Sequence, residues 1–268
     1  WGEDECVLWN VPVPADFDHG PRAVAWEGGE IDPVTCENTV PNPRVWVGYD
    51  GSKTYEVWRL NGATGAIEDQ VSIPDTGGRP YGGAVNAKGD FWMAVRGGPL
   101  VFIDAQTLQY ETFTTPGVTY GMGVDKNGDP WIVTYNSGPG KDRIYRLDTQ
   151  TKQWVDAGGT AGYYRGMQID REDRVWVAGN NPCRLILVDG KTDTLVNDNI
   201  PLPNCGVPVG ISIDVDGYVW VVDQTAHLAY KVDPVSYQVM LIVPNLSGPY
   251  TYSDMTGNGL QLVIHPPG

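Results

Sequence analysis

The chain of 268 residues contains no apolar run long enough to span a membrane, and no long stretch has the 3.6-residue apolar period of an amphipathic helix. Basic residues are also few: 18 Lys and Arg stand against 33 Asp and Glu, giving a formal net charge of −15. Because a phosphate backbone requires a basic surface, this charge argues against nucleic acids and anionic membranes as partners. These absences favour an all-β protein without a membrane span.

Histidine and cysteine are scarce as well. The three histidines are His19, His227 and His265, so few side chains are available as a general base near neutral pH. The four cysteines do not show the Cys-x₂₋₄-Cys spacing of structural zinc sites; the nearest spacing is Cys183 to Cys205. Their even number favours two disulfides, and therefore a secreted or periplasmic protein.

A block of eleven residues recurs four times without a change in length. Its copies begin at Gly82, Gly121, Gly166 and Gly210, and each ends on a tryptophan. The fifth position of each copy is Asn or Asp: Asn86, Asp125, Asp170 and Asp214. The eighth position is Gly89, Gly128, Asp173 and Gly217. An Asx followed three positions later by Gly is typical of a tight turn, so we expect each block to form a β-hairpin of strands A and B. The spacing of 39 to 45 residues between copies is that of β-propeller blades.

A second signature follows each tryptophan: an apolar strand, an Asx, and Ser or Thr three residues later. The five pairs are Asn61/Thr64, Asp104/Thr107, Asp148/Thr151, Asp189/Thr192 and Asp233/Ser236. We interpret it as the end of strand C and the turn into the outer strand D. Its first copy indicates a blade before the first intact block, with a longer A–B turn.

The complete pattern predicts one domain over 1–268, a six-bladed β-propeller closed by its N-terminal strand. The predicted blades lie near 17–78, 79–117, 118–162, 163–206 and 207–248, with the sixth formed by 249–268 and 1–16. Cys183 and Cys205 then fall in neighbouring loops on one face. Cys6 and Cys36 fall together on the other face. We therefore predict the disulfides Cys6–Cys36 and Cys183–Cys205.

The repeats resemble those of the virginiamycin B (streptogramin) lyase family and the wider NHL-type propellers, over roughly residues 20–256. The lyases open a cyclic depsipeptide by elimination, using histidines, a glutamate and magnesium. A key histidine of that family directly precedes a strand-A glycine. The matching positions here are Tyr81, Tyr120, Arg165 and Val209, with Arg22 and Tyr250 by extrapolation, and none is histidine.

In a propeller, the D→A and B→C loops lie on one face, here called the top, where ligands usually bind. Tyrosine and arginine, which are enriched in binding hot spots, gather at these positions. The predicted ligand-binding residues are Arg22, Tyr81, Arg96, Tyr120, Tyr135, Arg165 and Tyr250. The alternative is that these tyrosines pack against loops and the arginines pair with local carboxylates.

We therefore predict a non-catalytic extracellular binding propeller, expected to be a monomer. Its ligand, of anionic or aromatic character, would be a small molecule, a glycan or a protein. The alternative is a metal-dependent lyase or lactonase, for which His19 and His227 are the candidate catalytic residues and Mg²⁺ or Ca²⁺ the implied cofactor. The segment Asp125-x-Asn127-x-Asp129 resembles the start of a calcium loop, although it coincides with the A–B turn. A third interpretation is a piece of a longer surface protein.

Overall fold

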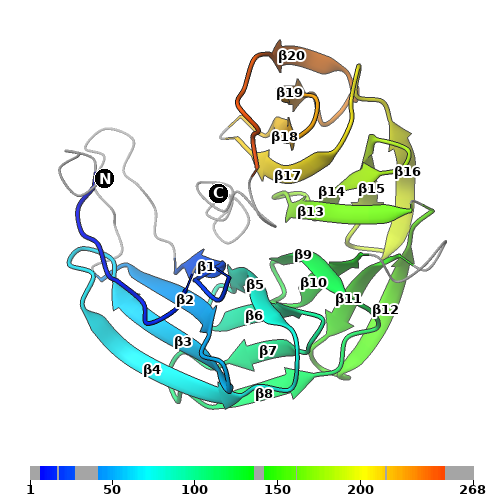
Figure 1. Cartoon of the computed structure of the whole chain (residues 1–268). Helices are drawn as coiled ribbons and strands as arrows, with labels where there is room; N and C mark the ends of the chain where they lie inside the picture. Colours follow the sequence, from blue (N-terminus) through cyan, green and yellow to red (C-terminus); the bar gives the residue numbers. More distant parts are fainter. Residues whose placement is uncertain are drawn as a thin grey trace. The chain divides into compact units, whose positions relative to one another are not determined.

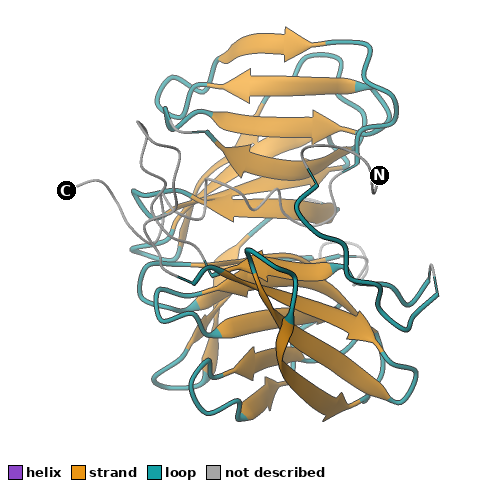
Figure 2. Cartoon of the chain, turned by 90° about the vertical axis from the view of Figure 1, so that its left-hand side faces the viewer, coloured by secondary structure: helices purple, strands orange, loops and turns teal. Residues whose placement is uncertain are grey.

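The computed structural model describes residues 7–16, 18–27, 42–135, 142–160, 162–214 and 216–250. These residues form twenty β-strands, connected by turns and loops (Figure 2). The strands make five four-stranded antiparallel sheets, and in each sheet the strands follow one another in chain order. The predicted all-β class is therefore confirmed. No helix in the described part of the chain meets the length and hydropathy needed to cross a membrane.

The chain divides into two compact units, Trp1–Phe113 and Thr114–Gly268. The first unit holds two sheets, whose strands are β1 (Ala23–Trp26), β2 (Arg44–Asp50), β3 (Thr54–Asn61), β4 (Ile67–Pro74), β5 (Arg79–Val85), β6 (Phe91–Arg96), β7 (Leu100–Ile103) and β8 (Tyr110–Phe113). Within this unit β1 lies beside β5, so the first strands of the two sheets are neighbours (Figure 1).

The second unit holds three sheets. Their strands are β9 (Thr119–Val124), β10 (Pro130–Thr134), β11 (Ile144–Asp148), β12 (Gln153–Gly158), β13 (Tyr163–Ile169), β14 (Arg174–Asn180), β15 (Arg184–Asp189), β16 (Thr194–Ile200), β17 (Pro208–Ile213), β18 (Val219–Asp223), β19 (Leu228–Val232) and β20 (Val239–Val243). The first strands β9, β13 and β17 lie side by side (Figure 1). Trp176, Leu187 and Tyr230 belong to one buried core cluster shared by the last two sheets.

The Asx of each repeat caps the A–B turn, as the sequence predicts. One carboxylate oxygen of Asp125 accepts hydrogen bonds from the backbone N–H groups of Asn127 (2.9 Å) and Asp129 (3.0 Å). Gly128, at φ 87°, donates its N–H to the carbonyl oxygen of Asp125 (3.0 Å). Turn geometry thus accounts for the Asp-x-Asn-x-Asp pattern that resembles a calcium loop.

The second signature is also a turn. Asp104 accepts hydrogen bonds from the backbone N–H groups of Gln106 (2.9 Å) and Thr107 (2.7 Å). Asp148 and Asp233 accept the corresponding pairs at the same position of their sheets. The spacing between Asx and Ser/Thr therefore marks the C–D turn, as predicted.

Residues 7–16 pack on the first sheet without being assigned to a strand. Trp9, Val11 and Val13 contact the cluster that contains Trp58, and the indole nitrogen of Trp9 donates to the carbonyl oxygen of Gly62 (2.8 Å). Closure by the N-terminal strand stays a prediction. Most of the predicted sixth blade, together with Cys6 and Cys36, lies outside the described residues.

Candidate functional site

The residue before each strand-A glycine occupies a β-bulge. In the sheet of β5 to β8, Pro80 pairs with Val95 and Gly82 with Ala94, so Tyr81 is the extra residue. Equivalent register shifts occur beside Tyr120, Arg165 and Val209. Bulges re-aim side chains, and they commonly occur next to functional sites. The position singled out in the sequence is therefore one at which the backbone departs from regular pairing.

A close backbone approach explains one of these glycines. A Cβ atom at Gly121 would clash with the carbonyl oxygen of Arg165 and would approach the backbone nitrogen of Met167 to 3.1 Å. Glycine at this position lets β9 lie against β13, which brings Tyr120 and Arg165 together.

The Arg165 guanidinium lies over two tyrosine rings. Its central carbon is 5.4 Å from the ring centre of Tyr120 and 5.0 Å from that of Tyr135, within cation–π range. Its terminal nitrogens make only long hydrogen bonds, to the hydroxyl of Tyr120 (3.3 Å) and that of Tyr135 (3.4 Å). Its Nε atom is buried without a hydrogen-bond partner, and no described carboxylate forms an ion pair with it. Within the described residues, the contacts of this guanidinium are therefore with aromatic rings and phenol hydroxyls.

Two more tyrosines complete what we call the tyrosine–arginine cluster: Tyr120, Tyr135, Tyr163, Arg165 and Tyr250. The hydroxyl groups of Tyr120 and Tyr250 are 2.6 Å apart, and the rings of Tyr135 and Tyr163 pack at 5.3 Å. Tyr163 is not among the sequence-predicted residues. It lies two positions before Arg165 on β13, so the period-2 alternation of a strand is the signal that could have found it.

Tyr120 is buried, with 1% of its surface exposed, whereas Tyr135, Arg165 and Tyr250 are half-buried. The structure thus gathers four of the seven predicted ligand-binding residues in the second unit.

The other three predicted residues belong to the first unit. Arg96 is exposed and its guanidinium lies over the ring of Tyr81, 5.5 Å from the ring centre. Tyr81 is 2% exposed. Arg22 donates its backbone N–H to the carbonyl oxygen of Gly48 (3.3 Å). Tyr81 and Arg96 therefore form a smaller stacked pair of the same chemical type.

The candidate histidines are held by local contacts. His19 Nδ1 lies 2.6 Å from an oxygen of Asp16, and this contact lowers the pKa of the Asp16 carboxyl. In the second unit, His227 Nδ1 accepts a hydrogen bond from the backbone N–H of Gly248 (3.1 Å). An accepting Nδ1 places the proton of the neutral ring on Nε2. His265 lies outside the described residues.

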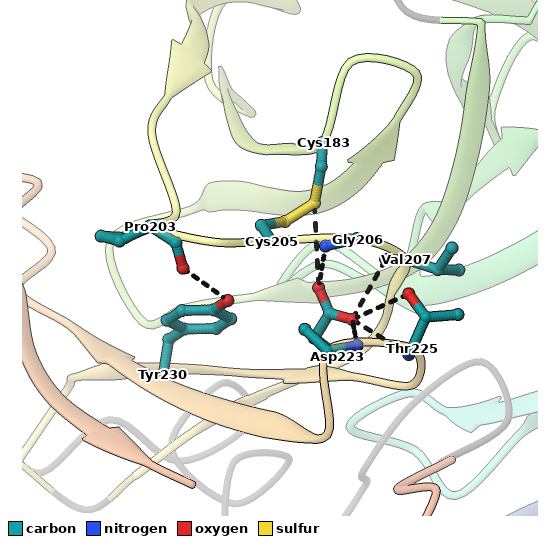
Figure 3. Close-up of a disulfide and its surroundings, with 9 residues drawn as sticks. Cys183, Pro203, Cys205, Gly206, Val207, Asp223, Thr225 and Tyr230 are labelled. Carbon is teal, nitrogen blue, oxygen red and sulfur yellow. Dashed lines mark hydrogen bonds between the residues drawn. A yellow bond between two sulfur atoms is a disulfide. The ribbon is translucent and has the colours of Figure 1, made fainter.

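The predicted disulfide Cys183–Cys205 is present. It joins the loop between β14 and β15 to the loop between β16 and β17, and it lies beside Asp223, the last residue of β18 (Figure 3). Asp223 is fully buried and accepts hydrogen bonds from the backbone N–H groups of Gly206 (2.7 Å) and Val207 (3.1 Å). This carboxylate therefore fixes the segment that follows Cys205.

Comparison with solved structures places this geometry in a known fold. A catalytically inactive variant of virginiamycin B lyase from Staphylococcus aureus, with quinupristin, aligns over 90% of this chain and 76% of its own, with a TM-score of 0.67 and 18% identity. The fold is that of the virginiamycin B lyase-like β-propellers. The resemblance stated from the repeats is thus confirmed at the level of fold.

Other solved structures that match this chain differ in what they do. A gluconolactonase from Xanthomonas campestris aligns over 88% of this chain and 78% of its own (TM-score 0.59, 13% identity). A nidogen/laminin complex supplies a match over 87% of this chain and 83% of its own (TM-score 0.60, 11% identity). Enzymes and protein-binding propellers both share the fold. No family model and no curated protein matches the sequence.

The metal implied by the virginiamycin B lyase resemblance requires oxygen-rich ligands. Among the described His, Cys, Asp and Glu residues, one group of three gathers closely enough to hold an ion: Cys183, Cys205 and Asp223. Two sulfur atoms and one carboxylate do not suit Mg²⁺ or Ca²⁺. This group does not fit the magnesium chemistry of the lyases.

Proposed function

We propose that this chain is an extracellular, non-catalytic binding propeller whose tyrosine–arginine cluster binds an anionic ligand. The observation that carries the proposal is Arg165, a half-buried guanidinium with no carboxylate partner among the described residues. A guanidinium offers five donors in a planar fork that matches a carboxylate or phosphate. In the part of the chain that the structure describes, two long bonds to phenols are the hydrogen bonds that the Arg165 guanidinium makes.

Arg165 is one of several arginines that bond to groups other than carboxylates: Arg79 donates to the backbone carbonyl oxygen of Asp18, and Arg184 donates to the hydroxyl of Thr160. Six other arginines form ion pairs with carboxylates of the described chain: Arg44, Arg59, Arg143, Arg146, Arg171 and Arg174. The chain offers 33 Asp and Glu as charged partners for its arginines. The aromatic surroundings of Arg165 instead preserve its charge for a ligand, and the rings of Tyr135 and Tyr163 offer apolar area beside it.

The test is a binding screen with acidic glycans and aromatic carboxylates as probes, followed by titration calorimetry of any that bind. Arg165→Met keeps the apolar volume and removes the donors, so binding should fall at least about tenfold, as expected for a charge-assisted bidentate contact. Arg171→Met removes an exposed arginine at the opposite end of the same sheet and should leave the affinity unchanged. Equal affinities for the two variants would overturn the proposed site.

The alternative, a metal-dependent lyase or lactonase, is supported by the enzymes among the matching structures. It requires a catalytic base, with His19 and His227 as candidates, and a divalent cation, Mg²⁺ or Ca²⁺. The test is an assay for ring opening of quinupristin or of a sugar lactone. Activity that is lost after dialysis against a chelator, and also lost in the His227→Ala variant, would favour the enzyme. Retention of that activity in the His19→Ala/His227→Ala double variant would reject this version.

The proposed architecture has six blades. Trp46, Trp131 and Trp176 are fully buried and Trp92 nearly so, whereas Trp220 of the fifth sheet is half-buried, which supports a further blade against that sheet. Removal of residues 251–268 should therefore lower the melting temperature. The disulfide Cys183–Cys205 supports a secreted or periplasmic location. The proposed monomer can be tested by sedimentation.

A further inference from the structure

Three metal-ligating side chains meet at the top of the last two sheets. The two sulfur atoms of Cys183 and Cys205 and one oxygen of Asp223 all lie within 4.8 Å of one another (Figure 3). Cys183 Sγ is 3.9 Å from Asp223 Oδ2. Bonds of about 2.3 Å to sulfur and about 2.0 Å to oxygen would separate two such ligands of one tetrahedral Zn²⁺ by roughly 3.5 Å. The spacing is therefore close to that of a metal site.

Hydrogen bonds from backbone N–H groups fix the orientation of the Asp223 carboxylate. Asp223 is fully buried, and no described Lys or Arg forms an ion pair with it. One oxygen accepts the N–H groups of Val207 (3.1 Å) and Ala226 (2.8 Å), whereas Oδ2, which faces the sulfurs, accepts one backbone N–H, that of Gly206. Hydrogen bonds of this kind orient metal-binding carboxylates. A buried negative charge without a cationic neighbour also favours the entry of a cation.

The loop that carries Cys205 is held by contacts other than the disulfide. Tyr230 donates its hydroxyl to the carbonyl oxygen of Pro203 (2.9 Å), two residues before Cys205. Asp223 accepts hydrogen bonds from the backbone N–H groups of the two residues that follow Cys205. The cysteines are half-buried, so reductant and metal can reach the sulfurs from solvent. Breaking the S–S bond would therefore leave Cys205 close to its present place.

We propose that Cys183, Cys205 and Asp223 form a redox-gated site for a soft divalent cation such as Zn²⁺. In the oxidised chain the two sulfurs bond to each other and no metal binds. A dithiol reductant supplies two electrons and two protons, which breaks the S–S bond and forms two thiols, while the reductant becomes a disulfide. Zn²⁺ then displaces both thiol protons and binds two thiolates and the Asp223 carboxylate, with water as the fourth ligand.

This inference does not depend on the tyrosine–arginine cluster. The experiment uses the full chain carrying Cys6→Ser and Cys36→Ser, so that only two thiols can form. After reduction and removal of the reductant without air, Co²⁺ is added as a spectroscopic probe. We expect one Co²⁺ per reduced chain, with a thiolate-to-cobalt charge-transfer band and the d–d bands of tetrahedral cobalt, displaced by Zn²⁺. The oxidised chain should show neither feature.

Two variants separate the three-ligand site from a simple dithiol. Asp223→Asn should weaken Co²⁺ binding by more than about tenfold, because even outer-shell partners of a metal ligand contribute that much. Asp233→Asn, in the exposed C–D turn of the same sheet, is the matched control and should bind as the parent does. If Asp223→Asn does not fold, Cys205→Ser provides the same test with one thiolate removed. Unchanged binding in these variants, or a reduced chain that folds without binding or unfolds on reduction, would overturn the proposal.

Discussion

The indole nitrogen of Trp176 donates a hydrogen bond to the carboxylate of Asp170, six residues earlier (2.8 Å). The same bond joins Trp131 to Asp125 (3.1 Å) and Trp220 to Asp214 (2.9 Å). The fifth and eleventh positions of the repeat are therefore linked directly. The acid accepts backbone N–H groups of the turn with one oxygen and the indole with the other.

The repeat that carries asparagine shows what this acid contributes. Asn86 caps its turn by accepting from Lys88 and Asp90. Its amide nitrogen, however, donates to an oxygen of Asp90 (3.0 Å), so it offers the indole no acceptor. Trp92 Nε1 is accordingly buried without a hydrogen-bond partner. An amide can thus replace the acid in the turn, but not in its bond to tryptophan.

The first prediction concerns Asp170→Asn. The amide would keep the turn but would leave the buried Trp176 N–H facing another donor. Arg174 would lose the nearer of its two charged partners (2.6 Å) and keep only Glu172 (3.2 Å). Leaving a buried donor unsatisfied costs about 1–3 kcal/mol, and breaking a largely buried ion pair adds to it. Urea unfolding should therefore show a loss of about 3 kcal/mol in the free energy of unfolding.

Asp189→Asn is the matched control for that substitution. Asp189 caps a C–D turn of the same sheet by accepting from the N–H of Lys191 (2.8 Å), and asparagine can make the same bond. Its effect should remain within about 0.5 kcal/mol. A similar loss for both variants would show that charge, and not the indole bond, matters at position 170.

Much of the fold could be predicted because the same sequence signatures recur along the chain. The turn at Asp125 and the strand that contains Trp131 follow from spacing and turn chemistry that recur along the chain. The pairing of Cys183 with Cys205 followed from the same framework, because a blade model assigns each loop to one face. Local, periodic features are those that a single sequence defines best.

The site was less predictable because it depends on contacts between sheets. The sequence marks the position of Arg165, but its surroundings depend on Tyr120 of β9 and Tyr135 after β10, and Tyr250 after β20 in turn contacts Tyr120. Asp223 carries no repeat signature at all. Its role becomes visible only when two loops bring Cys183 and Cys205 beside it.

The second prediction tests the close approach of β9 to β13. Gly121→Ala would place a methyl group against the carbonyl oxygen of Arg165. Because this is a backbone atom, relieving the clash would require a shift of the strand. Overpacking of this kind costs about 1–3 kcal/mol. We expect a lower melting temperature and, because Arg165 is displaced, weaker binding of any ligand found in the screen.

Gly123→Ala provides the comparison on the same strand. A Cβ atom there would meet only side-chain carbons of Ile169 at 3.4 Å, and Gly123 has no positive φ. The free energy of unfolding of this variant should lie within about 0.5 kcal/mol of that of the parent. If both alanines destabilise equally, the argument from the Arg165 carbonyl oxygen is wrong.

The third prediction is a loss of stability in acid. Hydrogen bonds from the backbone N–H groups of Thr107, Thr151 and Ser236 are the leading cause that lowers the pKa values of Asp104, Asp148 and Asp233, respectively, below 3.8. A lowered folded-state pKa contributes stability above the unfolded value, and this stability is lost as pH falls through the folded value. The melting temperature should therefore drop below about pH 4.

Substituting asparagine at the same three positions distinguishes the contribution of these turn carboxylates to acid sensitivity from that of other carboxylates. Asn61 fills the equivalent position of the first sheet and accepts the same two backbone N–H groups, so the turn does not require a charge. The triple Asp→Asn variant should keep its fold and show a shallower decline of melting temperature between about pH 4 and pH 2. A decline as steep as that of the parent would assign the acid sensitivity elsewhere.

The fourth prediction concerns alkaline pH. Burial, reinforced by the negative charge of Asp223, raises the pKa of Tyr230 from 10.0 to about 12. A raised folded-state pKa contributes stability below the unfolded value of 10.0, which is lost as pH rises towards 12, here about 2 to 3 kcal/mol. Tyr230→Phe should cost about 1 kcal/mol at pH 7, because the carbonyl oxygen of Pro203 loses its donor.

Above pH 10 the same variant should lose stability less steeply than the parent, so the two stability curves should converge. Burial also raises the pKa values of Tyr49, Tyr55 and Tyr145, and these groups keep some alkaline sensitivity in both proteins. Urea unfolding at several pH values between 7 and 12 measures the convergence. Parallel curves would mean that Tyr230 ionises equally in the folded and unfolded chains, and that its burial against Pro203 does not suppress the phenolate.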